Sequence, residues 1–286
     1  MNVSEPPLRS YLYVPGSDPR RIEKALDSEA DAVVLDLEDA VAPNHKDEAR
    51  RTVAGVLESE PAKPVFVRVN ATGSEIADRD IETLAGAGLT GLRLPKTESA
   101  ESVRAVAKKL ESVGCGAAIQ CLIESALGLE LIFEIARAHP RVVGVSLGEA
   151  DLSADLGVRG EEGLLYARSR VVAAARAAGL PGPVQSVYTN VRDLDGLGRS
   201  TEAGRDLGFI GRSAIHPTQI PIINKAFTPT DAEVEEASEL LDRLDSEAAS
   251  GTGAFALEDG RFVDRAVVES ARRTLTLARY EREGLS

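Results

Sequence analysis

The chain has 286 residues, 43% of them apolar and 28% charged, a composition that fits a folded globular protein and excludes wholesale disorder. Acidic residues outnumber basic ones by 46 to 33, so the net charge is −13. This excess works against binding to nucleic acid or to an anionic membrane, because both need clustered Lys and Arg. Two cysteines and three widely spaced histidines exclude a disulfide framework and a tetrahedral zinc site.

The N-terminal residues contain neither a basic region nor an apolar stretch of the kind found in secretory leaders. No apolar run approaches the ~20 residues needed to cross a bilayer. We therefore expect a soluble, cytoplasmic protein that binds neither membrane nor nucleic acid.

Short apolar runs alternate with longer segments of helical period along most of the chain. The runs that predict strands are Tyr11–Val14, Ala32–Leu37, Val65–Val69, Gly91–Leu94, Ala117–Ile123, Val142–Leu147, Pro183–Val187 and Phe209–Ile215. The segments that predict helices are Arg20–Leu26, Lys46–Leu57, Asp78–Ala85, Glu98–Leu110, Leu127–Ala138, Leu164–Ala178, Asp195–Leu207 and Ile220–Ala226. Continuous apolar strands are covered on both faces, and eight such alternations predict an α/β fold, a (β/α)8 TIM barrel, over residues 1–228.

Residues 229–286 exceed what eight units require. Thr230–Ala249 reads as an acidic helix, Ala254–Asp264 as a hairpin-like turn after two glycines, and Ala266–Glu281 as a last helix. We expect this segment to form a C-terminal helical extension of the barrel.

Ionisable side chains end five of the predicted strands. In a barrel of this kind, functional residues lie at the carboxyl ends of the strands, so these side chains should share one rim. They are Asp36, Glu38 and Asp39 at the end of the second strand, Arg68 in the third, Lys96 after the fourth, Glu124 after the fifth, and Glu149 and Asp151 after the sixth.

Glu124 and Asp151 close adjacent strands with no histidine or thiolate beside them. Two carboxylates are hard oxygen ligands, which suit Mg²⁺, or Mn²⁺ in its place. The alternative is that both acids stabilise helix N-termini. Arg68 could stabilise oxyanion charge beside a metal or serve only in a rim salt bridge, and Asp36 and Glu38 could position it or form salt bridges alone.

The turn at Gly16 and Ser17 opens a helix that carries Arg20, Arg21 and Lys24. Backbone N–H groups and cations at a helix start suit a phosphate, although a solvated basic face is an equal alternative. The string Gly144-Val-Ser146-Leu-Gly148 matches a serine-hydrolase elbow, but Ser146 lies inside a predicted strand. The only histidine downstream is His216, so this function is disfavoured.

Several motifs occur in the order typical of one superfamily. They are Leu8-Arg-Ser-Tyr-Leu-Tyr-Val-Pro-Gly16, Leu35-Asp-Leu-Glu-Asp-Ala-Val41, Val67-Arg-Val-Asn70, Leu94-Pro-Lys96, Ile123-Glu124, Asp151-Leu-Ser-Ala-Asp-Leu-Gly157, Ala214-Ile-His-Pro217 and Phe262-Val-Asp264. From about residue 8 to residue 280 the chain resembles the CitE-like proteins of the HpcH/HpaI aldolase and citrate lyase β-subunit superfamily.

This resemblance implies a Mg²⁺-dependent carbon–carbon lyase that acts on a 3-hydroxyacyl-CoA such as malyl-, citramalyl- or citryl-CoA, or the reverse condensation with or without thioester hydrolysis. It assigns Glu124 and Asp151 to the metal and Arg68 to the substrate. Tyr13, Arg20, Lys24, Ser213 and Ala214 fall at thioester or CoA positions. Asp264 matches a catalytic aspartate on a C-terminal lid that reaches a neighbouring subunit, which implies a homotrimer.

Three other functions compete with a stand-alone CoA-dependent lyase. They are the β subunit of citrate lyase acting on an acyl-carrier-protein thioester, a metal-dependent pyruvate aldolase, and a catalytically silent thioester-binding protein. The presence of Glu124, Asp151, Arg68 and Asp264 together disfavours the silent protein.

Overall fold

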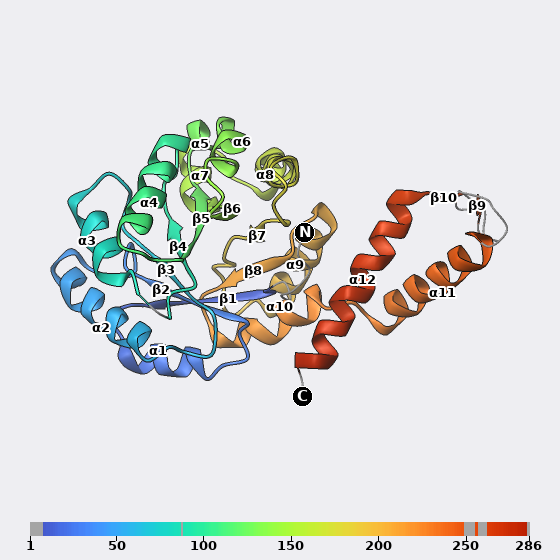
Figure 1. Ribbon diagram of the computed structural model, residues 1–286, viewed down its shortest axis with the longest axis horizontal. Coiled ribbons are helices and arrows are strands. Elements are labelled where there is room, and N and C mark those ends of the chain that lie inside the picture. The colour runs from blue at the N-terminus through green and yellow to red at the C-terminus, as the bar shows by residue number, and fades with distance from the viewer. Residues whose placement is uncertain (1–7, 87, 249–254, 257–261, 285–286) are drawn as a thin grey trace. The chain divides into compact units, whose positions relative to one another are not determined.

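The first unit of the chain, residues 8–224, is a nearly closed barrel of parallel strands with helices outside (Figure 1). The computed structural model describes residues 8–86, 88–248, 255–256 and 262–284. The strands are β1 (Ser10–Pro15), β2 (Ala32–Asp36), β3 (Val65–Arg68), β4 (Gly91–Leu94), β5 (Ala118–Ile123), β6 (Val142–Leu147), β7 (Val184–Gln185) and β8 (Gly211–Ala214). Their order β6-β5-β4-β3-β2-β1-β8-β7, with β6 and β7 also in contact, confirms the predicted TIM barrel.

Helices follow the strands in the predicted order, and the structure adds one that the periodicity did not predict, α7 (Glu149–Leu156) after β6. The helices are α1 (Pro19–Leu26), α2 (Lys46–Glu58), α3 (Glu75–Leu84), α4 (Ala100–Ser112), α5 (Ala126–Glu130), α6 (Ile132–Ala136), α7, α8 (Leu165–Ala177), α9 (Leu194–Leu207) and α10 (Ile220–Phe227), with short 3-10 turns at Pro43–His45, Glu161–Leu164 and Pro217–Gln219. Serine side chains cap three helix starts, since Ser74, Ser99 and Ser125 each accept a backbone N–H three residues on.

Two predicted elements are wrong in extent. The single helix expected over Leu127–Ala138 is divided into α5 and α6 at Leu131. The strand expected over Pro183–Val187 shrinks to the two residues of β7, because only Val184 and Gln185 pair with β8. Both cysteines are buried and neither forms a disulfide.

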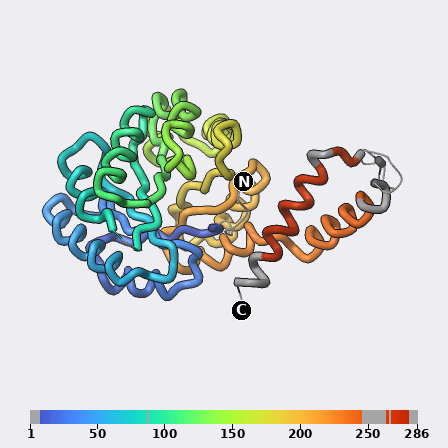
Figure 2. The backbone as a smooth tube through the Cα atoms, viewed as in Figure 1, coloured from blue at the N-terminus to red at the C-terminus, as the bar shows by residue number. Residues whose placement is uncertain are grey.

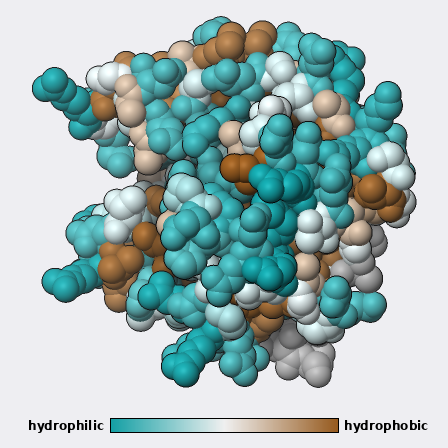
Figure 3. Space-filling view, turned by 90° about the vertical axis from the view of Figure 1, so that its left-hand side faces the viewer, coloured by the Kyte–Doolittle hydropathy of each residue, from teal (hydrophilic) through white to brown (hydrophobic). Residues whose placement is uncertain are grey.

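The barrel interior is apolar near one end of the strands and polar near the other. Tyr11, Val34, Phe66 and Val184 belong to one buried cluster inside the ring, together with Ala32. The ionisable groups lie at the carboxyl ends of the strands, so this rim of the barrel is the one expected to hold the functional site. On the outer face that Figure 3 shows, hydrophilic side chains predominate and hydrophobic ones are scattered.

The second unit contains residues 225–286. Helix α11 (Asp231–Ala248) and helix α12 (Arg265–Gly284) lie side by side (Figure 2). Between them in sequence, the short strands β9 (Phe255–Ala256) and β10 (Phe262–Val263) pair antiparallel. Ala237 and Leu240 of α11 meet Val268 and Ala271 of α12 in a small apolar core of their own. In the described residues no helix is both long and apolar enough to span a membrane.

Candidate active site

A cavity of about 510 Å³ opens at the carboxyl ends of the barrel strands. Its described lining contains five carboxylates but only two cationic side chains, those of Arg21 and Arg68. The carboxylates belong to Asp36, Asp39, Glu124, Glu149 and Asp151. The cavity is therefore acidic on balance, which favours a bound cation.

Glu124 follows β5 directly and is buried. Its Oε2 accepts the backbone N–H of Lys96 at 2.7 Å. Lys96, the donor of this hydrogen bond, has φ +49°, in the left-handed region that L-residues rarely adopt. Gly148 lies against the other side of the carboxylate, where any Cβ would overlap Glu124. Lys96 and Gly148 thus hold the Glu124 carboxylate in one place.

Burial raises the pKa of Glu124 to about 7. The negative charges of Glu38 and Asp151 act in the same direction, against the Lys96 N–H and the Arg68 charge. Asp151 itself is exposed on the first turn of α7, whose N-terminus has no side-chain cap.

The raised pKa of Glu124 gives a testable stability difference in the metal-free protein. Its carboxyl titrates near 4.5 when unfolded, so the stability that it contributes is complete below that pH and is lost as pH rises through 7. The glutamine of the Glu124→Gln variant is neutral at every pH, so its contribution to the stability does not fall as the pH rises. The melting temperature of Glu124→Gln should therefore gain several degrees on that of wild type between pH 4.5 and pH 8. A constant difference, measured by calorimetry with a chelator present, would contradict the buried carboxyl.

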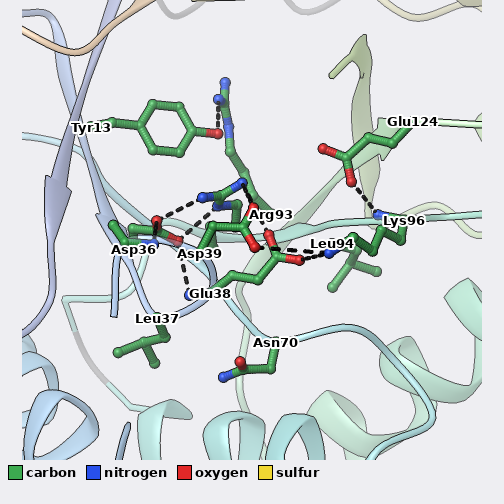
Figure 4. Close-up of polar contacts among 12 residues, drawn as sticks. Tyr13, Asp36, Leu37, Glu38, Asp39, Asn70, Arg93, Leu94, Lys96 and Glu124 are labelled. Atoms are coloured by element: carbon green, nitrogen blue, oxygen red, sulfur yellow. Dashed lines mark hydrogen bonds and ion pairs between the residues drawn. The ribbon is translucent and has the colours of Figure 1, made fainter. Parts of the chain in front are cut away.

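Arg68 is held by Asp36 at the end of β2 and by two acids in the loop that follows, Glu38 and Asp39. Figure 4 shows these three acids side by side. Arg68 Nε and Nη2 donate to the two oxygens of Asp36 at 2.7 and 2.6 Å. Its Nη1 lies 3.0 Å from Glu38 Oε2 and 3.5 Å from Asp39 Oδ2. Lys96 Nζ donates to the remaining Glu38 oxygen at 2.6 Å. These ion pairs fix Arg68 at the cavity wall and raise its pKa, so it stays charged.

Glu149 also faces the cavity, and a salt bridge neutralises it. Arg168 donates to both Glu149 oxygens at 2.7 and 2.6 Å, and its Nη1 lies 2.7 Å from Glu161. In the described residues no group of three His, Cys, Asp or Glu could hold a metal. Glu149 is thus occupied by its salt bridge to Arg168, which leaves Glu124 and Asp151 as the two neighbouring carboxylates that could bind a cation.

The cation-rich segment after β1 lies partly outside the cavity. Arg20 and Lys24 are exposed on α1 and do not line the cavity, whereas Arg21 lines it while its Nε pairs with Asp18 at 3.1 Å. Tyr13 and Ser213 line the cavity; Ala214 is fully buried beside them.

Asp264 belongs to the second unit. It is exposed, and its Oδ1 accepts the backbone N–H of Val267 at 3.1 Å at the start of α12. The cavity lining described above lies entirely in the first unit.

Sequence reasoning gave no role to Arg93, which is 1% exposed in the middle of β4. A charged residue inside the apolar run Gly91–Leu94 was the available signal, because an arginine is rarely buried without a purpose. It also missed Arg168, whose pairing with Glu149 joins residues that are far apart in sequence.

Residues 9–217 match the profile of the HpcH/HpaI aldolase/citrate lyase family. The chain belongs to that family. It is similar to the (3S)-malyl-CoA thioesterase of Cereibacter sphaeroides (strain ATCC 17025 / ATH 2.4.3), 38% identical over 95% of each chain. It is also similar to the citrate lyase subunit beta of Escherichia coli (strain K12), 35% identical over 97% of this chain and 94% of that one.

Among solved structures, the chain is similar to the CitE protein of Mycobacterium tuberculosis in complex with magnesium, acetoacetate and coenzyme A. The TM-score is 0.79 at 34% identity, over 94% of this chain and 97% of that one. The family expected from the motifs is confirmed.

Proposed function

We propose that this chain is a Mg²⁺-dependent carbon–carbon lyase that cleaves a 3-hydroxyacyl-CoA into a keto acid and an acyl-CoA. The observation that carries the proposal is the carboxylate pair Glu124 and Asp151 at the barrel mouth. A relative of the same fold is described with magnesium, acetoacetate and coenzyme A, which adds support.

The residues present fit a divalent cation. The cavity lining is acidic, and the Glu124 carboxylate is buried, held by a single backbone N–H and destabilised in its charged form. Mg²⁺ takes one or two carboxylates and leaves other positions to water and substrate. We assign Glu124 and Asp151 as its ligands. When bound, the metal supplies a Lewis acid that polarises the keto acid's oxygens.

The side chains around the cavity have separate roles in this proposal. Cleavage breaks the bond between the hydroxyl-bearing carbon and the α-carbon, so the hydroxyl loses a proton and the α-carbon gains one. Asp264 accepts the hydroxyl proton and delivers it to the α-carbon, and moves it in the opposite direction in the reverse condensation. Arg68 faces the hydroxyl oxygen of the substrate and stabilises the negative charge that this oxygen gains as it loses its proton, while Asp36 and Glu38 hold the guanidinium in place.

Coenzyme A would lie along the β1 side of the mouth, with Tyr13, Ser213 and Ala214 near the thioester and Arg20 and Lys24 near the phosphates. Arg20→Glu and Lys24→Glu should then raise the KM for a CoA ester about tenfold each, with little change for the matching pantetheine ester. Steady-state kinetics on both esters measure this. Equal effects on the two esters would show that these cations only support α1, and the exposed Arg104→Glu on α4 is the charge-matched control.

A β subunit of citrate lyase is the second candidate, because relatives of that name are nearly as similar as the thioesterases. A panel of malyl-, citramalyl- and citryl-CoA esters with Mg²⁺ separates the two, with keto-acid and free-thiol release followed together. Release of keto acid from a CoA ester supports the stand-alone lyase, and thiol release in addition shows hydrolysis. Turnover only of acyl-carrier-protein thioesters would favour the citrate lyase subunit.

We also propose that the enzyme works in the cytoplasm as a homotrimer, with residues 229–286 as a lid on a neighbouring barrel. The family resemblance supports this assembly. Light scattering on the purified protein should give three times the chain mass of 30.3 kDa.

A further inference from the structure

Arg93 is the buried cation of the barrel interior. It leaves β4 and reaches the opposite strands, where its Nη1 donates to Tyr13 Oη on β1 at 2.9 Å and to Ser213 Oγ on β8 at 3.1 Å. Its Nε donates to Gln120 Oε1 at 2.7 Å, and its guanidinium lies over the Tyr11 and Tyr13 rings. One side chain therefore connects four strands beneath the cavity.

No ion pair neutralises Arg93 among the described residues, and its Nη2 is buried with no hydrogen-bond partner there. The two arginines of the cavity lining differ, since Arg21 pairs with Asp18 and Arg68 with Asp36. Burying an unpaired charge opposes folding. Because the buried charge of Arg93 costs stability, its presence in the barrel interior points to a role in binding or chemistry.

The direction of its hydrogen bonds gives that role. A guanidinium can only donate, so the hydroxyls of Tyr13 and Ser213 must both accept from Arg93. Their own protons then point elsewhere, and the described residues provide no acceptor for either. Both residues line the cavity, so the free direction is the cavity (Figure 4 shows Tyr13 and Arg93).

We infer that Arg93 is a positioning residue that presents the Tyr13 and Ser213 hydroxyls as two donors to the thioester carbonyl oxygen of the substrate. The inference rests on the proposed function. Strands β1 and β8 are neighbours; three strands separate β1 from β5, after which Glu124 lies, and β7 alone separates β8 from β6, which leads into α7 and Asp151. The two polar ends of the substrate are thus held by different parts of the ring.

The choice of the thioester oxygen follows from which wall each group occupies. Glu124 and Asp151 are the proposed metal ligands, and the metal would bind the oxygens of the keto acid. Those oxygens therefore belong on the side of Glu124 and Asp151, where without the metal the carboxylates would repel them. Arg68 is already bonded to Asp36 through two nitrogens. The β1 wall continues into α1 with its exposed cations, which places the CoA side of the molecule next to Tyr13.

Acetyl-CoA and S-ethyl-CoA test this inference, because they differ only in the carbonyl oxygen. Calorimetry with Mg²⁺ should show that wild type binds acetyl-CoA about tenfold more tightly, the value of two modest hydrogen bonds. Arg93→Met should reduce this preference to about twofold and leave the affinity for S-ethyl-CoA unchanged. Tyr13→Phe and Ser213→Ala should each reduce it in part, and the double variant should abolish it.

Ser146→Ala is the matched control, since Ser146 lines the same cavity from β6 and is not among the hydrogen-bond partners of Arg93, which are Tyr13, Ser213 and Gln120. It should keep the full preference. A full preference in Arg93→Met would overturn the inference. If that variant does not fold, a full preference in the Tyr13→Phe/Ser213→Ala double variant would overturn it equally. Equal weakening of both ligands in these variants would mean a structural role only, whereas wild type that binds neither ligand would contradict the proposed function itself.

Discussion

Replacing Glu124 with glutamine should lower keto-acid release about a thousandfold at saturating substrate. The amide has nearly the same shape and can still accept the Lys96 N–H, but it lacks the charge that a divalent cation needs. The loss is that of the Lewis-acid contribution, which amounts to several kcal/mol. Keto acid released from malyl-CoA is measured as its phenylhydrazone, and Mg²⁺ binding is measured separately by calorimetry.

Asp151→Asn should have a similar effect, and the double variant should lose little more, because both side chains act through one bound ion. Glu101→Gln is the matched control, since it makes the same change on an exposed turn of α4 outside the cavity. Mg²⁺ should also raise the melting temperature of wild type but not of Glu124→Gln. Undiminished activity in Asp151→Asn would remove the metal assignment.

Asp264→Asn should lower turnover about 10²–10⁴-fold, the usual contribution of a general acid–base group, while leaving Mg²⁺ binding intact. If the second unit serves a neighbouring barrel, each site combines Glu124 from one chain with Asp264 from another. Mixing inactive Glu124→Gln chains with inactive Asp264→Asn chains should then restore about a quarter of wild-type activity in trimers of random composition.

The controls for this mixing experiment are each variant mixed with itself, which should stay inactive. Subunit exchange is verified by mass spectrometry of differently tagged chains. Verified exchange with no recovered activity would show that each chain completes its own site. A monomer with full activity would show the same.

The sequence alone determined the barrel and the positions of its rim residues. A strand covered on both faces must be apolar throughout, so eight continuous apolar runs separated by helical periods leave few alternatives. The carboxyl ends of parallel strands meet at one rim, so the sequence is enough to place Glu124, Asp151, Asp36 and Arg68 near one another. These features depend on local pattern and on chain order, which the sequence carries directly.

Only the tertiary structure decided which of those side chains are paired and which are open. Arg68 is bound by Asp36, Glu149 is neutralised by Arg168, and Arg93 spans the barrel to two hydroxyls on the far wall. The burial that raises the pKa of Glu124 and the fit of Gly148 against it also come from several strands at once. Such contacts join residues distant in sequence, and their energies depend on distance and on the exclusion of water, neither of which any local pattern specifies.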